Sequence, residues 1–577
     1  MKKIKPINGF HLTGVTGTLA DNLTQNWLIG LRETNPAILD MFAERDTKPY
    51  RDLLPWSGEF AGKYLTGAHT IYSLNHNEQL KDYVVRFIEE LLTYVDEDGY
   101  IGCFQKACHL TGAYSQTPSV TGATWDAWSH YHILMGLLLW TDELDRTDWQ
   151  AAIYKIADLF LRTFYTGNRR LVDIGSTEMN LAPIHIFALL YARTGNESYR
   201  RFCEEILQDL SAPTAGDYIR HSRKGLEYYQ CPKPRWESLH IIQGIAAFGK
   251  AINDPSLEQV AHQIFHSILR TDVHNTGGFS TDEQAVGNPY GNGAIELCCV
   301  IAYNALACDM LYQTGDSRIA DFLELSLYNA VLGSLSPSGR WSTYNTPMEG
   351  TKCANYHSIV FQSRPGSPDL NCCSVNAARG VGMLSDWAIL QQENTLYLNS
   401  YEACDVELDG GFRLRVTGNY PREPLVKIQL TSANTTCPPY KLALRIPAWS
   451  KSTTVQFADQ TIHASGGNYT YLEPAWDGEE LLLHLDFTPH FAEGGGEYQG
   501  KCSVYYGPIL YGCDQSCNRS IDIEQLPTLS RAELESARPT QRADGRWVIS
   551  LNNGVTLSDF YRLGITGSRY TTWLNCL

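Results

Sequence analysis

Five polar joints at regular spacing constrain the fold of this chain more than any other feature. Each combines residues that end a helix, such as Asn and Gly, with residues that begin one, such as Asp, Ser and Pro. The spacing of about 50 to 70 residues predicts a series of helical hairpins, which bury their inner faces by stacking as a solenoid or by closing into an α/α toroid. The joints read LNHNEQ (74–79), LDRTDW (144–149), RTGNES (193–198), INDPSL (252–257) and QTGDSR (313–318).

The segments between the joints are amphipathic at helix spacing. In one of them, Val84, Ile88, Leu91, Leu92 and Val95 fall on a single face. The loops that connect the hairpins are irregular and rich in Gly, His and Trp. Such loops favour the closed toroid, with a site at its centre.

Beyond residue 390 the pattern changes to short β-rich runs separated by Gly, Pro, Asn and Asp. We therefore predict a helical domain over 11–390 and a β-sandwich region of one or two domains over 391–577. Residues 1–10 are strand-like, and we expect them to join the β region. That region either binds sugar or buttresses the toroid. The runs include TLYLNSY, FRLRVTG, LVKIQLTS, KLALRIPAW and ELLLHLDF.

Composition excludes several classes of protein. Hydrophobic residues make up 43% of the 577, and no run of eighteen apolar residues occurs, so we expect no membrane span. The basic start MKKIKP is not followed by the apolar stretch of a signal peptide, which predicts a cytoplasmic protein. A formal net charge of −17 without Lys and Arg clusters argues against nucleic-acid binding.

The net negative charge suits a neutral or a cationic ligand better than an anionic one. Tyrosine (33) and tryptophan (13) are plentiful, and their faces stack on sugar rings, although most aromatic residues only pack in cores. We expect a small oligosaccharide or glycoside as substrate. The sequence leaves monomer and homodimer open.

Thiols and one carboxylate form a candidate metal site. Glu296 and Cys298 lie two positions apart, which would place them on different faces of a regular helix. They can share a metal if the helix begins near Glu296, after the loose NGNGA segment. The adjacent thiols of Cys372 and Cys373, in a polar loop flanked by proline, could turn to the same centre. Three thiolates and one carboxylate suit zinc, but the spacing by itself favours separate buried thiols, as expected for Cys299.

Five motifs follow one another in the helical region. They are a glycine-rich loop with Glu283, then Glu296-x-Cys298, Glu324-LSLYN-Ala330, Tyr344-Asn345-x-Pro347 and Cys372-Cys373-x-x-Asn376. Their order and spacing resemble glycoside hydrolase family 127, the β-L-arabinofuranosidases, and its sister family 146. Weaker similarities extend over most of the chain, in PWSGEFAGKYL (55–65), LALRIPAW (442–449) and VYYGPILYG (504–512).

The resemblance implies an (α/α)6 barrel followed by β-sandwich domains, and a retaining exo-glycosidase that acts on β-L-arabinofuranosides or a related rare-sugar furanoside of plant glycans. It implies Cys372 as the nucleophile and Glu283 as the general acid and then base. It further implies sugar contacts by Glu324, Tyr344 and His240, and Zn²⁺ bound by Glu296, Cys298, Cys372 and Cys373.

Two departures from the family pattern lie beside the expected sugar site. Ser374 and Val375 stand where many members have two prolines, and the interval from Glu283 to Glu296 is a few residues shorter. Asp282 is therefore an alternative acid/base. Two other functions remain open on the residues alone: a toroid isomerase or epimerase that uses His240 and carboxylates, and a non-catalytic sugar-binding protein with structural zinc.

Overall fold

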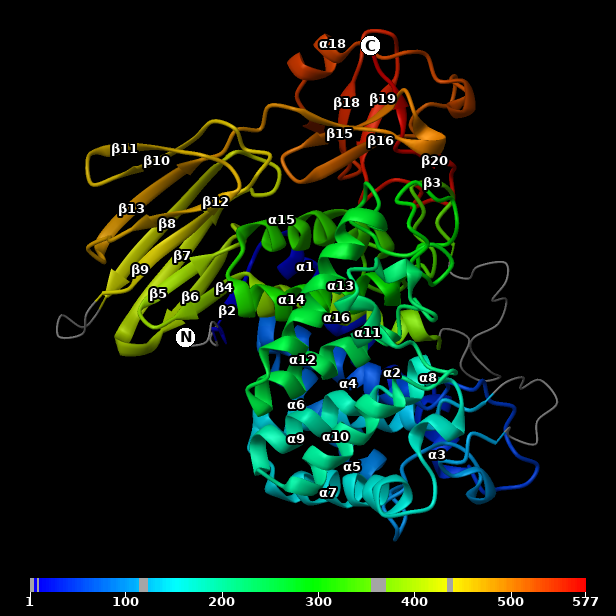
Figure 1. Ribbon diagram of the computed structural model, residues 1–577. Helices are drawn as coiled ribbons and strands as arrows, with labels where there is room; N and C mark the ends of the chain where they lie inside the picture. The colour runs from blue at the N-terminus through cyan, green and yellow to red at the C-terminus, as the bar shows by residue number, and fades with distance from the viewer. Residues whose placement is uncertain (1–4, 8–9, 114–122, 354–369, 433–438) are drawn as a thin grey trace.

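The structure is a computed structural model that describes residues 5–7, 10–113, 123–353, 370–432 and 439–577. A helical domain forms one part of the molecule, and β-sheet domains lie above and beside it (Figure 1). Among the described residues, six helices form a closed inner ring, in which each contacts the next and the last returns to the first. In ring order they are α4 (Glu59–Asn75), α6 (Asp126–Leu144), α9 (Pro183–Thr194), α12 (Ser238–Ile252), α14 (Leu297–Thr314) and α16 (Cys372–Gly382).

An outer layer of helices surrounds the ring. Each inner helix from α4 to α14 is followed by an outer helix that packs on it, and an N-terminal helix packs on α4 and α16. The inner helices are buried on nearly every face, whereas the outer helices bury one stripe, as expected from their amphipathic sequences. The outer helices are α1 (Val15–Leu23), α5 (Glu78–Leu92), α7 (Thr147–Phe160), α10 (Glu197–Asp209), α13 (Pro255–Thr271) and α15 (Ser317–Leu325).

The five predicted joints are confirmed, because each connects an inner helix to the outer helix that follows it. At every joint the inner helix ends on a residue in the left-handed region, for example Gly195 after α9 and Gly315 after α14. Asn or Asp then caps the outer helix at four joints, for instance Asn77, whose side chain accepts from the Leu80 amide. These signals act within a few residues, which explains why the sequence reveals them.

Close packing of the inner ring depends on a small residue in α4. A Cβ placed on Gly62 would lie 2.2 Å from the backbone carbon of His132 in α6. No side chain fits at that distance. Gly62 therefore lets these two inner helices pack with their backbones in near contact.

A β-sandwich beside the barrel consists of two sheets within the described residues. Its strands alternate between buried and exposed residues, as in β7 and β8. One sheet has the order β1 (Lys5–Pro6), β4 (Ile389–Gln392), β5 (Thr395–Leu398), β9 (Lys441–Ile446) and β12 (Asn468–Leu472). The other has the order β11 (Gln460–Ala464), β10 (Thr453–Phe457), β13 (Asp477–His484), β8 (Leu425–Ser432), β7 (Phe412–Gly418), β6 (Cys404–Leu408) and β2 (Phe10–Leu12).

The N-terminal strands belong to this sandwich, although the chain then enters the barrel. β1 pairs with β4, and β2 pairs with β6, both antiparallel. The first described residues therefore connect the sandwich to the helical domain.

A third sheet near the C-terminus contacts the barrel segment that carries Tyr344. β3 (Glu349–Gly350), from that segment, pairs with β20 (Tyr570–Thr571), and the Thr572 amide donates to the Met348 carbonyl at 3.2 Å. The C-terminal domain thus supports one wall of the barrel mouth. The other strands are β14 (His490–Glu493), β15 (Lys501–Tyr506), β16 (Ile509–Asp514), β17 (Thr540–Gln541), β18 (Trp547–Ser550), β19 (Thr556–Asp559) and β21 (Leu574–Asn575).

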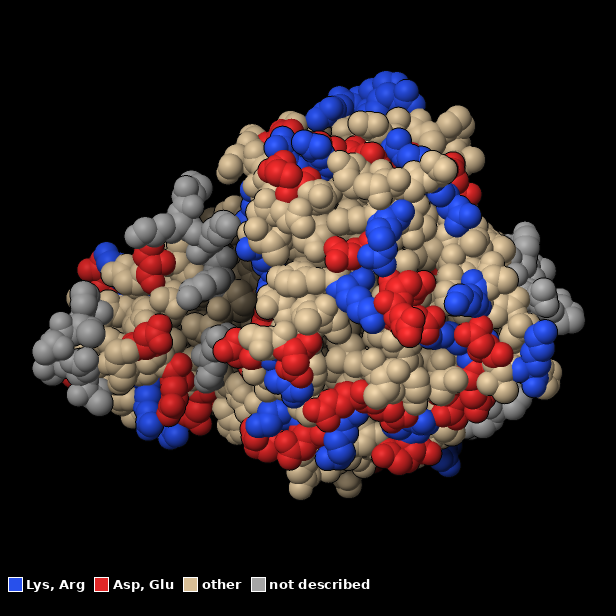
Figure 2. Space-filling view, turned by 90° about the horizontal axis from the view of Figure 1, so that it is seen from below, with Lys and Arg blue, Asp and Glu red and all other residues tan. Residues whose placement is uncertain are grey.

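In the described part of the chain, no helix combines the length and apolar character needed to cross a membrane. On the face that Figure 2 shows, acidic and basic residues are interspersed over most of the surface, and one group of basic residues lies at the upper edge of the view.

Candidate active site and metal centre

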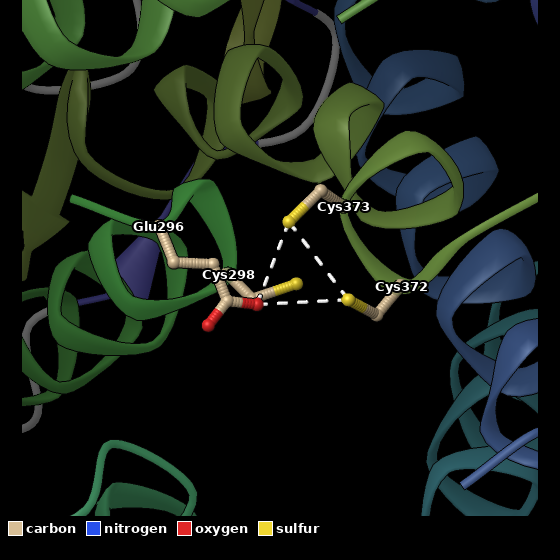
Figure 3. A group of neighbouring side chains, drawn as sticks. All are labelled: Glu296, Cys298, Cys372 and Cys373. Carbon is tan, nitrogen blue, oxygen red and sulfur yellow. Dashed lines mark hydrogen bonds between the residues drawn. The ribbon is translucent and has the colours of Figure 1, made fainter. Parts of the chain in front are cut away.

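Four potential metal ligands converge where two neighbouring inner helices begin. Glu296 and Cys298 come from the start of α14, and Cys372 and Cys373 open α16 (Figure 3). One ligand atom from each residue lies within 4.8 Å of all the others, and all four residues are buried. The Glu296 Oε1 atom lies 3.6 Å from the Cys372 sulfur and 3.5 Å from the Cys373 sulfur. Residues 76 positions apart are thus brought to one centre that could hold a metal ion.

The two helix starts explain how adjacent or closely spaced residues reach one point. Glu296 precedes α14 with an extended backbone (φ −77°, ψ 137°), so its side chain is free of the helical register that would separate it from Cys298. The predicted irregular backbone at this residue is confirmed.

The expected loop at the cysteine pair is wrong, because Cys372 and Cys373 form the first turn of α16. Asn371 accepts from the Ser374 amide at 2.9 Å, and the Ser374 hydroxyl accepts from the Asn371 amide at 3.0 Å. This capping box satisfies amides that would otherwise lack partners at the helix start. Ser374, at one of the two positions where proline was expected, therefore shapes the segment that presents both thiols.

A fourth cysteine touches the cluster without being one of the four potential ligands. The Cys299 sulfur lies 3.4 Å from Glu296 Oε2, the oxygen that faces away from Cys372 and Cys373. Burial raises the pKa of the Cys299 thiol well above its usual range. Cys299 is buried, as predicted, and as a neutral thiol it donates to the ligand carboxylate.

A buried cation lies next to the cluster, on the side of Cys298. The Lys63 ammonium, on α4, lies 3.8 Å from the Cys298 sulfur and 2.8 Å from Glu59. Burial would lower the pKa of Lys63, but the Cys298 thiolate and the Glu59 carboxylate outweigh it and raise that pKa. Asn376 also donates to the Cys298 sulfur, at 3.5 Å. Both contacts stabilise negative charge on this sulfur.

A cavity of about 210 Å³ opens beside the cluster. Two of the ligands, Glu296 and Cys372, form part of its wall, and so does Glu283. Much of the remaining wall is aromatic, which suits the face of a sugar ring. The other lining residues are Trp56, Glu59, Trp125, Arg235, Trp236, Glu237 and Tyr344.

Glu283 is held in this wall by two donors. Arg235 Nη2 donates to Glu283 Oε2 at 2.6 Å, and the Tyr344 hydroxyl donates to Oε1. Burial and the nearby Glu296 and Glu283 carboxylates raise the pKa of Tyr344, so its hydroxyl stays protonated as a donor. The backbone of Asp282 and Glu283 is left-handed, with φ of 50° and 68°, a conformation that is costly for such residues and concentrates at functional sites.

Asp282, the alternative acid, points away from the cavity. Its side chain is exposed, and Oδ1 accepts from the Ala294 amide at 2.9 Å. Asp282 is not among the residues that line the cavity. The geometry favours Glu283.

Two further residues expected at the sugar do not reach the cavity. Glu324, on α15, is buried and binds Arg445 of β9, together with Tyr420 and Trp449. Its carboxylate thus connects the barrel with the β-sandwich, and the geometry does not support the expected sugar contact. His240 lies behind Trp236, where its Nδ1 atom is 2.9 Å from the Tyr131 hydroxyl. Burial lowers the pKa of His240 well below its usual range, which makes the ring neutral.

Sequence reasoning missed most of the cavity wall. Trp56, Trp125 and Trp236 are distant along the chain, and no local period joins them. Arg235 and Glu237 precede the start of α12, much as Glu296 precedes α14. A polar residue just before an inner helix is the one signal that could have identified Glu237.

Two family models match most of this chain. A family model described as the GH127 catalytic domain of β-L-arabinofuranosidase matches residues 21–386, and the model of the GH127 middle domain matches residues 395–487. The non-reducing end β-L-arabinofuranosidase of Bifidobacterium longum subsp. longum is 22% identical over 387 residues, or 60% of this chain. The match spans 58% of that relative's length.

Solved structures share the whole architecture. A GH127 β-L-arabinofuranosidase from Geobacillus stearothermophilus T6 superposes with a TM-score of 0.76 at 17% identity, covering 98% of this chain and 100% of that one. Another GH127 β-arabinofuranosidase gives 0.77 at 17% identity, with coverages of 99% and 97%. The predicted fold class, an (α/α)6 barrel followed by β-sandwich domains, is confirmed. Since the catalytic-domain model alone matches more than half of its length, this chain belongs to glycoside hydrolase family 127.

Proposed function

We propose that this protein is a retaining, zinc-dependent exo-glycosidase that removes β-L-arabinofuranose or a related furanose from small glycans. The observation that carries the proposal is that Cys372 and Glu283 line one cavity of about 210 Å³, whose wall includes the metal ligands. A cavity of this volume suits a single terminal sugar residue. The family membership and the arabinofuranosidase relative support the choice of sugar.

The donor set fits zinc. Three thiolates and one carboxylate within 4.8 Å make a soft, tetrahedral-sized site of the kind that zinc prefers. Zinc bound there would keep the cysteines deprotonated and fix their orientation. Glu296, Cys298, Cys372 and Cys373 would hold it.

The reaction then needs two residues of this chain. The Cys372 thiolate attacks the anomeric carbon and forms a C–S bond, while the Glu283 carboxylic acid gives its proton to the departing glycosidic oxygen as the C–O bond breaks. Next, the Glu283 carboxylate takes a proton from water, and the resulting hydroxide attacks the same carbon. The C–S bond breaks and Cys372 leaves as thiolate. Two inversions at one carbon retain its configuration.

A variant that lacks the general acid/base residue tests this function directly. We expect Glu283→Gln to lower kcat/KM for a β-L-arabinofuranosyl disaccharide by about 10²- to 10⁴-fold, because the leaving oxygen loses its proton donor. The loss should be smaller on a 4-nitrophenyl β-L-arabinofuranoside, whose leaving group needs no proton, and azide should partly restore turnover. Zinc content is measured alongside.

Asp282→Asn is the matched control, because it changes the adjacent carboxylate and keeps an acceptor for the Ala294 amide. It should behave like wild type. A large loss in Asp282→Asn with a normal Glu283→Gln would transfer the role to Asp282. Wild-type protein that contains zinc but hydrolyses neither glycoside would contradict the proposed function.

We expect the positive charge of Lys63 to strengthen zinc binding. Four anionic donors around a doubly charged ion leave a net charge of about −2, which is costly to bury without a nearby cation. We expect Lys63→Met to weaken zinc binding by about 10- to 100-fold, measured by competition with a chromogenic chelator. The control is Lys81→Met, which removes an exposed lysine paired with Glu78 on α5. Equal affinities in the two variants would contradict this role for Lys63.

A further inference from the structure

One guanidinium connects two carboxylates in the cavity wall. Arg235 Nη2 lies 2.6 Å from Glu237 Oε1 and 2.6 Å from Glu283 Oε2, and Arg235 Nε donates to Glu237 Oε2 at 3.0 Å. Glu237 is only 1% exposed, whereas the Arg235 side chain is 26% exposed. Glu237 therefore takes two of the three contacts and fixes the guanidinium plane, and the third contact reaches Glu283.

The backbone holds this arrangement in register. Arg235 and Gln284 form an antiparallel bridge, flanked by hydrogen bonds from the Trp236 amide to the Glu283 carbonyl (3.2 Å) and from the Ala285 amide to the Pro234 carbonyl (2.9 Å). Glu237 itself is the residue that precedes α12. The position of Arg235 relative to Glu283 is thus set by main-chain contacts and by a buried carboxylate.

Arg235 carries a positive charge between two carboxylates, those of Glu237 and Glu283. Glu237 takes two of the three guanidinium contacts, so the charge of Arg235 is shared between the carboxylates of Glu237 and Glu283. A residue that acts first as a general acid and then as a base must be protonated in the first step and ionised in the second. The charge beside it should therefore favour neither form strongly. Burial raises the pKa of Glu237, against the opposing effect of Arg235.

Other groups face Glu283 from the surrounding elements. Tyr344 donates to it from the segment before β3, Glu296 and Cys372 contribute charge from the starts of α14 and α16, and Lys63 with Glu59 lies on α4. These groups are the same in every variant of Arg235 or Glu237. Differences among such variants therefore report on the Arg235–Glu237 pair.

We propose that Arg235 and Glu237 are positioning residues for the acid/base: Arg235 holds the Glu283 carboxylate in the cavity wall, and Glu237 holds Arg235 and offsets its charge. The proposal rests on the proposed function, since it requires Glu283 to transfer protons. It adds two residues to the catalytic machinery that act through Glu283 rather than on the sugar.

The test is the alkaline limb of the pH profile of kcat/KM, which follows the ionisation of the group that must be protonated. Arg235→Gln removes the cation that lies 2.6 Å from the Glu283 carboxylate, so the limb should move to higher pH by about one unit. Glu237→Gln removes the competing anion, so the limb should move to lower pH. We therefore expect the alkaline limb to move in opposite directions in the two variants, although both break the same ion pair.

Three further variants separate positioning from stability. Arg235→Lys keeps the charge but not the forked geometry, so the limb should stay within a few tenths of a unit of wild type while kcat falls and KM changes little. Arg413→Gln and Glu407→Gln break an exposed ion pair of 2.7 Å between β7 and β6 of the β-sandwich and should leave the profile unchanged. Zinc content and the melting temperature of each variant are recorded.

The outcomes are distinct. Limbs that stay in place in Arg235→Gln and Glu237→Gln, or that move in the same direction, would overturn the positioning proposal and leave the glycosidase function standing. If Arg235→Gln does not fold, the test rests on Glu237→Gln. An alkaline limb of this variant that stays in place or moves to higher pH would overturn the positioning proposal. A wild-type protein without glycosidase activity would overturn both proposals.

Discussion

Cys372→Ala is expected to lose hydrolysis by about 10⁴-fold or more while the barrel stays folded, because no other thiol lines the cavity among the residues that the structure describes. Cys372 is 7% exposed, on the cavity side of the cluster, whereas Cys373 is 1% exposed. Loss of turnover is measured on the 4-nitrophenyl glycoside, and folding by the melting temperature. The matched control is Cys299→Ala, which removes a buried thiol of the same cluster that does not reach the cavity.

A nucleophile must be distinguished from a ligand, since both roles fail in Cys372→Ala. We expect the covalent intermediate to accumulate in Glu283→Gln, whose deglycosylation lacks a base, when it is given the activated aryl glycoside. Acid quenching and peptide mass spectrometry should then place one pentosyl group on Cys372. A sugar on a different residue, or full activity in folded Cys372→Ala, would show that Cys372 is not the nucleophile.

Arg445→Met is expected to destabilise the protein by about 3 to 5 kcal/mol, because it leaves two buried or partly buried carboxylates without their cation. Arg445 is fully buried in β9 and lies 2.5 Å from both Glu324 and Asp321 on α15. It also donates to the Asn399 carbonyl at 2.7 Å. The change in unfolding free energy is measured by urea denaturation followed by tryptophan fluorescence.

Glu324→Gln separates this structural role from a sugar contact. We expect lower stability, with KM and kcat of the folded protein close to wild type, because Glu324 is 1% exposed and away from the cavity wall. Arg318→Met, which breaks an exposed pair with Asp316 on the same helix, should change stability by less than about 0.5 kcal/mol. A raised KM with unchanged stability in Glu324→Gln would restore the sugar contact that the sequence suggested.

The sequence predicted those features that depend on residues only a few positions apart in the chain. The five joints were predicted because a cap is made by a side chain and an amide two or three positions apart, as between Asn77 and Leu80. The change from helices to sandwich was predicted because the period of the apolar residues changes along the chain. The break in the helix at Glu296 was expected for the same local reason.

The convergence of the ligands required more than local signals. Glu296 and Cys372 are 76 residues apart, and they meet because α14 and α16 are neighbours in a closed ring. Spacing alone favoured separate buried thiols, and only the similarity to a known family favoured one centre. The segment around Cys372 is a helix rather than the expected loop because Asn371 and Ser374 cap each other.

The cavity wall was decided by the tertiary structure alone. Glu237 and Arg235 meet Glu283 through a bridge between segments 48 residues apart, and Lys63 reaches Cys298 across 235 residues. Glu324, for which the family resemblance implied a sugar contact, binds Arg445, 121 residues away in another domain. Burial and charge pairing depend on which distant segments meet, and no local pattern carries that information. The sequence by itself therefore determined the helical hairpins, the sandwich and the candidate ligands, whereas the closure of the barrel decided which side chains surround the substrate.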